Sequence, residues 1–223
     1  MSKKKTKRRS RGSGSEVFII IGLGAVIIVI GLIALGGGLQ PPVSAESLTR
    51  CNGKPCPSKG NPDAPVLMVE LSDYACSHCR NYSLQVEPII DQEYVQTGKV
   101  RYVSHIYALR PQTESASAAA MCADEQSKYW EFHHTAFANQ RTDRYPGRDD
   151  FLAWGQQIGL NMDAFAQCID SNRYVQDVQF SAAEGERAGV TGTPSFYIDG
   201  RFIVGEISVA QARAALDAAL AGR

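Results

Sequence analysis

The chain has 223 residues, 44% of them hydrophobic and 21% charged, a composition typical of a globular domain with short extensions. Its 23 basic and 23 acidic residues balance overall, but residues 1–16 contain seven Lys or Arg and one Glu, so residues 17–223 have 16 bases, 22 acids and a net charge of −6. An acidic body argues against nucleic acid as the ligand, although the basic tail taken alone would also suit a nucleic-acid arm.

A long apolar segment follows the basic tail. Val17–Leu35 has 19 residues and no charge, enough to cross about 30 Å of hydrocarbon as a helix. Bases on its N-terminal side predict a cytoplasmic tail, with the chain after Leu35 outside the cytoplasm. A cleaved signal peptide ending at Ala45 is the alternative, but the apolar stretch is too long for one and ends ten residues before Ala45. The sequence therefore predicts an uncleaved, single-pass anchor in the cell membrane.

Residues 36–63 are expected to connect this anchor to a folded domain at 64–223. Residues 36–47 are typical of a spacer, flexible at the glycines and stiffer at the prolines. Residues 51–65 contain turn formers throughout and no apolar period, which predicts a loop with two cysteines in it.

The domain begins with a β-α-β pattern. Residues 66–72, "VLMVELS", form a short apolar run that suits a central strand covered on both faces. A helical pattern extends from Cys76 to about Thr97, and Pro88 within it should kink or interrupt the helix. Residues 100–107 predict a second strand, which a crossover helix would make parallel to the first.

Residues 112–188 carry only helical signals. They predict one long helix over 113–139 and three more over 149–159, 162–171 and 173–189. A turn at 190–194 then leads to a strand over 195–199, a tight Asp199-Gly200 hairpin turn and a strand over 201–204. Ser208 is expected to cap a final helix over 209–221. The fold class is therefore α/β, with a helical block inserted between the two halves of a sheet domain.

Six cysteines, an even number in a domain placed outside the cytoplasm, favour disulfides over free thiols. Zinc is the rival for the pair in "ACSHC", residues 75–79, but no second pair stands at knuckle spacing, and His105, His133 and His134 follow no ligand spacing. We therefore expect no metal. A structural bridge between Cys76 and Cys79 is the other alternative, although it would close almost no loop.

A redox role explains the position of the pair best. Cys76 follows a strand and opens a helix, where free backbone N–H groups and the helix dipole stabilise a thiolate. Cys79 lies one turn further on and should be more buried, as a resolving thiol needs to be. His78, when protonated, would add positive charge near the Cys76 sulfur, unless it is simply a solvated helix residue.

The strand–Cys-x-x-Cys–helix unit and the distant "GVTGTPSFYIDG" together resemble the thioredoxin superfamily. The helical block, with "CADEQSKYWEFHHTAF" and "FAQCIDS", is similar to that of the DsbA-type thiol:disulfide oxidoreductases of the bacterial cell envelope. The resemblance covers about residues 64–220. It implies a thioredoxin fold with an inserted helical domain and a redox-active disulfide in place of a separate cofactor.

The resemblance also implies roles for matching positions. Thr193-Pro194 looks like the family's cis-proline turn beside the cysteine pair, which offers backbone groups to an extended substrate. Glu70 matches a buried acid below the resolving cysteine, where a carboxyl with a raised pKa can exchange a proton with Cys79; an edge-exposed Glu is the alternative. Ser77 stands where the oxidising branch often has proline, which leaves the reduction potential open.

The other four cysteines allow three connectivities. We expect Cys122 to pair with Cys168 inside the helical block and Cys51 to pair with Cys56. The resulting expectation is an oxidase that donates its Cys76–Cys79 disulfide to exported proteins with free thiols and is re-oxidised by a quinone-linked membrane partner. A disulfide isomerase or reductase, or a non-catalytic metal-delivery or scaffold module, are the alternatives. Isomerases of this type usually carry a dimerisation module, and none is visible between residues 35 and 64, which favours the oxidase. A monomer is expected.

Overall fold

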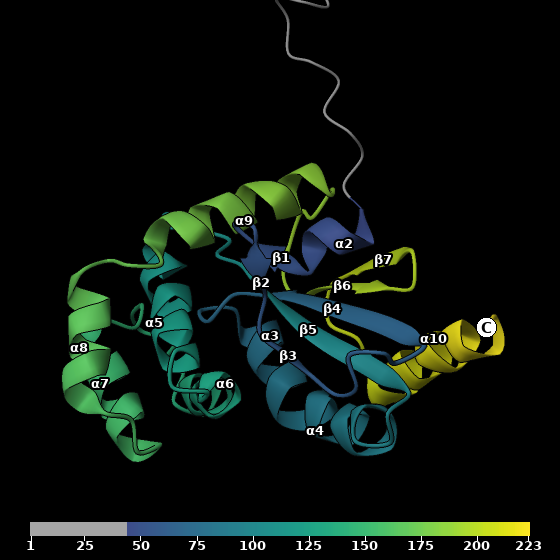
Figure 1. Ribbon diagram of the computed structural model, residues 1–223, viewed down its shortest axis with the longest axis horizontal. Coiled ribbons are helices and arrows are strands. Elements are labelled where there is room, and N and C mark those ends of the chain that lie inside the picture. Colours follow the sequence, from purple (N-terminus) through teal and green to yellow (C-terminus); the bar gives the residue numbers. More distant parts are fainter. Residues whose placement is uncertain (1–43) are drawn as a thin grey trace, which may run out of the picture. The chain divides into compact units, whose positions relative to one another are not determined.

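A five-stranded mixed sheet forms the centre of the fold (Figure 1). The computed structural model describes residues 44–223, and the predicted anchor at 17–35 lies outside the described residues. The strands run in the order β3-β5-β4-β6-β7, with β4 parallel to β5 and every other neighbouring pair antiparallel. Their bounds are Ser58–Lys59 for β3, Val66–Ser72 for β4, Val100–Ile106 for β5, Ser195–Ile198 for β6 and Arg201–Val204 for β7.

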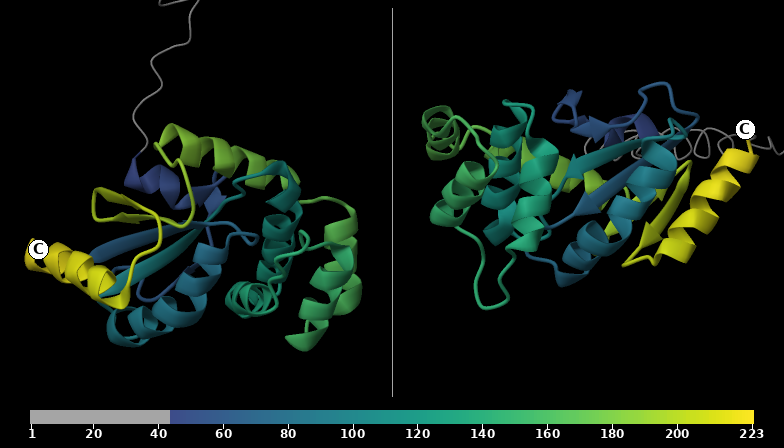
Figure 2. Two further views of the ribbon diagram at one scale, coloured as in Figure 1. Left: turned by 180° about the vertical axis from the view of Figure 1, so that it is seen from behind. Right: turned by 90° about the horizontal axis from the view of Figure 1, so that it is seen from below.

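Helices cover both faces of this sheet. Met68 and Glu70 of β4 point to the face covered by the helix that follows β4 and by α10 (Val209–Ala221), because side chains alternate along a strand. Val69 and Leu71 point to the other face, where α2 (Ala45–Leu48) and α9 (Val175–Arg187) pack. Both faces of β4 are therefore buried, and the view from below in Figure 2 shows α10 and the helix after β4 in front of the strands.

The helix after β4 continues through Pro88, as a series of α and π turns. Its π turns come directly before and after the short α segment that contains the proline, so the expected interruption takes the form of locally widened turns. Its segments are α3 (Ser77–Asn81), η1 (Tyr82–Val86), α4 (Glu87–Ile90) and η2 (Asp91–Val95).

The inserted block is helical, as expected, but the prediction of a single long helix over 113–139 is wrong. The chain turns at 125–128, where Ser127 adopts a φ of +58° that an α-helix cannot contain. Two helices therefore replace one. The block consists of η3 (Pro111–Thr113), α5 (Glu114–Asp124), α6 (Tyr129–Ala138), α7 (Arg148–Gln157) and α8 (Met162–Asp170), followed by α9.

The segment expected to be a loop at 51–65 also contains short strands. β1 (Arg50–Cys51) and β2 (Lys54–Pro55) form a small hairpin, and Ser58–Lys59 adds β3 to the edge of the main sheet beside β5. Two-residue strands carry too little apolar pattern to stand out in a sequence.

The C-terminal elements lie where the sequence predicts them. Asp199 and Gly200 both adopt positive φ in the tight turn between β6 and β7, and the Ser208 side chain accepts a hydrogen bond from the Gln211 N–H at the start of α10. Within residues 44–223, none of the helices combines the length and apolar character that crossing a membrane would require.

Candidate active site

Cys76 stands at the N-cap of the helix that follows β4, one residue before the position expected. Its sulfur lies 3.3 Å from the carbonyl oxygen of Thr193, which a protonated thiol can use as an acceptor, and the side chain is only partly buried. A hydrogen bond from the Cys79 thiol is the main cause that lowers the pKa of Cys76 to about 5, helped by the Thr193 side chain and by the backbone N–H groups of Cys79 and His78, while burial opposes it. Cys76 is therefore a thiolate at neutral pH.

Cys79 has the opposite environment. Its side chain is fully buried, and its sulfur accepts a hydrogen bond from the backbone N–H of Asp73 at 3.5 Å. Burial is the main cause that raises the pKa of Cys79 well above its ordinary value, and the neighbouring Cys76 raises it further. The two thiols are thus chemically unequal, with an accessible nucleophile and a buried neutral partner.

Thr193-Pro194 contains a cis peptide bond and lies beside Cys76. The turn leads directly into β6, which pairs with β4, so the sheet register brings it to the end of the strand that precedes the cysteines. Positions 117 residues apart in the sequence therefore meet at one sulfur.

The His78 side chain is directed to an acid that the sequence analysis did not identify. Its Nδ1 lies 2.6 Å from Oε2 of Glu206, in the segment after β7, and this hydrogen bond is the main cause that raises the pKa of His78. The charge of Cys76 raises it too, but less. Ser77 lines an open hollow of about 420 Å³ next to the cysteines, together with Gln140 and Arg144 among others.

Glu70 is fully buried, so the edge-exposed alternative is wrong. Oε2 of Glu70 accepts a hydrogen bond from the Tyr102 hydroxyl at 2.7 Å. Burial, followed by the charge of Glu87, raises the pKa of Glu70 to about 8. The carboxyl also affects Cys79, because its charge contributes to the raised pKa of that thiol.

Two further polar side chains hold the loop that precedes Cys76. Asp73 is buried, and its carboxylate accepts hydrogen bonds from the Ala75 N–H, the Leu109 N–H and the Thr113 hydroxyl, at 2.6–2.7 Å. Gln140, in the helical block, donates to the carbonyl of Cys76 at 3.1 Å. No sequence signal singles out either residue, because most of these contacts join positions that are 36 to 64 residues apart in the chain.

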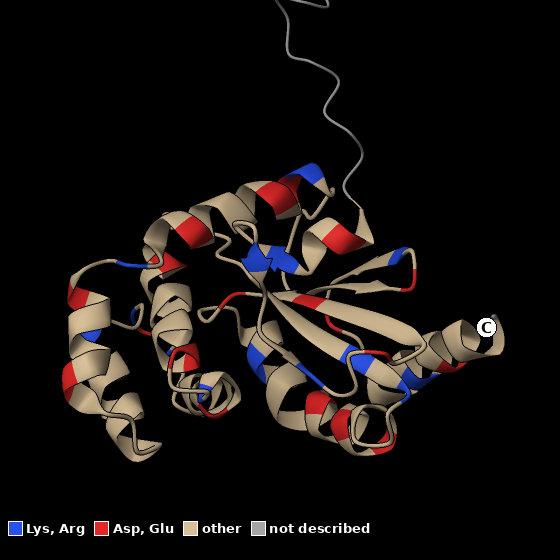
Figure 3. Ribbon diagram, in the orientation of Figure 1, with Lys and Arg blue, Asp and Glu red and all other residues tan. Residues whose placement is uncertain are grey.

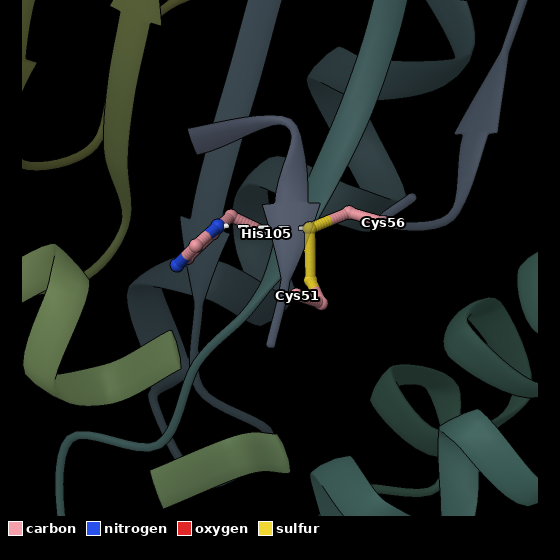
Figure 4. Close-up of side chains that lie close together, drawn as sticks. All are labelled: Cys51, Cys56 and His105. Atoms are coloured by element: carbon pink, nitrogen blue, oxygen red, sulfur yellow. Dashed lines mark hydrogen bonds between the residues drawn. A yellow bond between two sulfur atoms is a disulfide. The ribbon is translucent and has the colours of Figure 1, made fainter. Parts of the chain in front are cut away.

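The remaining cysteines form two disulfides, Cys51–Cys56 and Cys122–Cys168, the pairings that we expected. Figure 4 shows the first bridge beside His105, whose Nδ1 lies 3.7 Å from the Cys56 sulfur. The three side chains lie close enough to share a metal ion. Because both sulfurs are bonded to each other, they are not available as thiolate ligands in this state.

Comparison with known proteins identifies one family model and several relatives that match most of the chain. The thioredoxin family model matches residues 54–218. The chain is 30% identical over 166 residues to the Na⁺/H⁺ antiporter NhaA 3 of Salinispora tropica, a match that covers 73% of this chain but only 24% of the antiporter. It is 27% identical over 150 residues to the probable disulfide bond formation protein D of Bacillus cereus, covering 64% of this chain and 69% of that protein.

Among solved structures, oxidised BdbD from Bacillus subtilis superposes with a TM-score of 0.68 over 75% of this chain and 94% of that chain. At 18% identity this likeness concerns the fold alone. The chain spans about a quarter of the length of the antiporter relatives, so the similarity lies in one part of those proteins. The family model covers most of the chain, including the cysteine pair and the cis-proline turn. This chain therefore belongs to the thioredoxin family.

Proposed function

We propose that this protein is a thiol:disulfide oxidoreductase that donates the Cys76–Cys79 disulfide to substrate proteins with free thiols. The observation that carries the proposal is the inequality of the two sulfurs. A pKa of about 5 makes Cys76 a good leaving group and stabilises the reduced enzyme, which favours oxidation of substrates. Relatives named as disulfide oxidoreductases and disulfide bond formation proteins support the same chemistry.

The reaction is a pair of thiol–disulfide exchanges. A substrate thiolate attacks the sulfur of Cys76, a mixed disulfide forms, and the electron pair of the broken bond remains on Cys79, which takes a proton. A second substrate thiolate then attacks the substrate sulfur of the mixed disulfide and expels Cys76 as a thiolate. The substrate gains a disulfide, and the enzyme is left with two reduced cysteines.

The site is open enough for a protein substrate. Cys76 is half-buried, and the backbone of the Thr193-Pro194 turn beside it offers hydrogen-bonding groups to an extended chain. We further propose that the apolar segment at 17–35 anchors the enzyme in the cell membrane, with residues 44–223 outside the cytoplasm. A quinone-linked membrane partner would then re-oxidise the pair, and exported proteins would be the substrates.

Oxidation of reduced ribonuclease tests the activity. The wild-type protein in its oxidised form should restore ribonuclease activity, and Cys76→Ser should reduce the rate to background. Cys79→Ser has no disulfide to donate, but its Cys76 thiolate should attack a disulfide of scrambled ribonuclease, expel a ribonuclease thiolate and remain trapped as a mixed disulfide. Unchanged activity in Cys76→Ser would contradict the proposal. Refolding of scrambled ribonuclease distinguishes an oxidase from an isomerase. An oxidase restores the activity of scrambled ribonuclease poorly, whereas efficient restoration would show an isomerase.

A further inference from the structure

Three buried polar atoms converge behind the cysteine pair. They are Oε1 of Glu70, Oε2 of Glu87 and Nε2 of His133, and the three side chains each bring a carboxylate oxygen or imidazole nitrogen within 4.8 Å of one another. None of the three makes a hydrogen bond of good geometry among the described residues, although the side chains are fully buried; Nε2 of His133 and Oε2 of Glu87 approach to 3.5 Å. Buried polar atoms are costly without a partner, so three in one place require an explanation.

These atoms come from three different elements. Glu70 lies on β4, Glu87 on α4, and His133 on α6 of the inserted block, which packs beside the helix that follows β4 (Figure 1). The cluster is therefore built where the two halves of the fold meet. Figure 3 shows acidic residues on the strand and on the helix at this side of the sheet.

The other polar atoms of the three side chains already have partners. Tyr102 donates to Oε2 of Glu70 at 2.7 Å, and Lys59 donates to Oε1 of Glu87 at 2.6 Å. Nδ1 of His133 lies 3.1 Å from the Tyr74 hydroxyl. Because Nε2 of His133 faces the Glu87 carboxylate at 3.5 Å, the imidazole carries its hydrogen on Nε2 and accepts from Tyr74 on Nδ1.

The charges around the cluster favour one ionised carboxylate and one protonated carboxyl group. Lys59 of β3 contacts both Glu87 and Asp91, each at 2.6 Å, so one ammonium already faces two acids. His134 of α6 approaches Oε1 of Glu87 at 3.1 Å, and the remaining titratable groups that face Glu70 are the Cys79 thiol and four neutral hydroxyls. Those hydroxyls belong to Tyr74, Tyr82, Tyr102 and Tyr129.

The pKa values of Glu87 and Glu70 are shifted in opposite directions. Hydrogen bonds and charges from His133, His134 and Lys59 outweigh burial and hold the pKa of Glu87 well below its ordinary value. Burial and the charge of Glu87 raise the pKa of Glu70 to about 8. At neutral pH a hydrogen on Oε1 of Glu70 can therefore be donated to Oε2 of Glu87, which gives both unpaired oxygens a partner.

We infer that Glu70 and Glu87 form a buried carboxyl pair that shares one proton, that His133 positions Glu87 in this pair, and that the pair supplies the proton that Cys79 needs when the disulfide opens. Only the claim that the pair supplies a proton to Cys79 rests on the proposed function; the carboxyl pair itself does not. Family resemblance led us to expect an acid at Glu70; the second acid and the histidine from the inserted block are new elements of this site.

The proton balance of the first exchange step follows. When the substrate thiolate bonds to Cys76, the electron pair of the Cys76–Cys79 bond moves to the Cys79 sulfur, and the proton of Glu70 passes to that sulfur. Two adjacent carboxylates would then remain. His134, whose side chain is 40% exposed, contacts Glu87 and connects the pair to solvent, from which one proton restores the shared state.

Infrared difference spectroscopy of the reduced full-length protein tests the shared proton directly. We expect a protonated carboxyl band at pH 7 that is lost in Glu70→Gln and that titrates with a midpoint near pH 8 in the wild type. Glu87→Gln should move the midpoint to lower pH, because the neighbouring negative charge is gone. Lys59→Gln should move it to higher pH. If Glu70 is already ionised at pH 7, or if neither variant moves the midpoint, the inference is wrong.

A matched control lies on the same helix. Glu93→Gln removes an exposed carboxylate paired with Arg213 and should leave the carboxyl midpoint unchanged. Cys76→Ser should retain the carboxyl titration, so a failed exchange activity and a failed carboxyl pair are distinguishable. Titration with zinc or manganese chloride covers the remaining possibility: one ion bound per chain, and lost in Glu87→Gln, would overturn the shared proton in favour of a cation.

The role in catalysis has its own measurement. Reduction of the oxidised protein by dithiothreitol, corrected for the thiolate concentration of the reagent, should slow as pH rises through the carboxyl midpoint. In Glu87→Gln the decrease in this rate should begin at a lower pH than in the wild type, and the two pH differences, in rate and in infrared midpoint, should be equal. A pH profile identical to the wild type would show that the pair does not supply the proton to Cys79.

Discussion

Only two residues separate Cys76 from Cys79, yet their surroundings make the first a stable thiolate and the second a stable thiol. At the scale of single residues this difference makes a prediction about pH. The pKa of Cys76 in the folded, reduced protein is about 5, below the ordinary value of 9.0. The folded state therefore holds fewer protons than the unfolded state between these values, and stability from this group rises with pH across that window.

Denaturant unfolding of the reduced and oxidised forms checks this. The reduced protein should gain stability relative to the oxidised protein as pH rises from about 5 to about 9, and lose that gain as pH falls through 5. The oxidised protein has no thiolate and supplies the baseline. Cys76→Ala should abolish the pH-dependent part of the difference. A thiolate absorbance that titrates with a midpoint near pH 8 or higher would contradict the assignment of Cys76.

His78 and Glu206 give a second prediction at this scale. Glu206→Gln should lower the pKa of His78, because the hydrogen bond and the charge that raise it are both weakened. NMR titration of the imidazole in the reduced protein measures the change. Since the His78 side chain is exposed, high salt should shrink the shift in the wild type. A His78 pKa that is the same in both proteins would mean that the pair does not persist in solution.

At the scale of elements, the strands and the C-terminal helix follow closely from local pattern. The apolar run at 66–72 and the Ser208 cap are complete signals within a few residues, and both lie where expected. The turn that breaks the helix over 113–139 has no Gly or Pro; it depends on Ser127 adopting a positive φ, and its hydrogen bonds run from the Ser127 and Lys128 N–H groups to the carbonyls of Asp124 and Ala123. Local pattern cannot identify such a break.

The site shows the same limit. Cys76, Cys79 and Thr193-Pro194 stand out as motifs, whereas Glu206 and Gln140 are ordinary surface-type residues in the sequence. They reach the site only because β7 ends beside the cysteines and because the helical block folds back over the loop before Cys76. A single sequence contains no signal for contacts made over such separations.

The two disulfides give the prediction at the element scale. Cys122–Cys168 joins α5 to α8 across 46 residues, whereas Cys51–Cys56 closes a hairpin of five. In the chain-entropy model their loss should cost about 4 and about 2 kcal/mol of unfolding free energy, respectively. Denaturant unfolding of Cys122→Ser/Cys168→Ser and Cys51→Ser/Cys56→Ser should therefore rank them in that order. The reverse order would show that loop closure does not dominate their contribution.

At the scale of the whole molecule, the sheet and the helical block share one site. Asp73 of the loop before Cys76 accepts hydrogen bonds from Leu109 and Thr113 at the entry to the block, and Gln140 returns a hydrogen bond from its far side. His133 adds a buried contact between the block and Glu87. The block thus fixes the geometry of the thiols and the charge beneath them, so changes inside it should alter redox chemistry as well as stability.

The last prediction concerns where this unit works. Residues 44–223 form a compact unit with its own core, so a chain begun at residue 44 should fold and exchange disulfides. The full chain carries 19 uncharged residues after seven bases, which should hold it in the membrane through alkaline carbonate extraction. In intact cells a membrane-impermeant maleimide should label Cys76 of the reduced full-length protein and spare Cys79, because only the first sulfur is accessible. Release of the full chain by carbonate would show that the protein is not anchored in the membrane. Labelling only after the cells are broken would place the active site on the cytoplasmic side. Either result would remove the reason to expect exported proteins as substrates, while leaving the exchange chemistry of the two thiols intact.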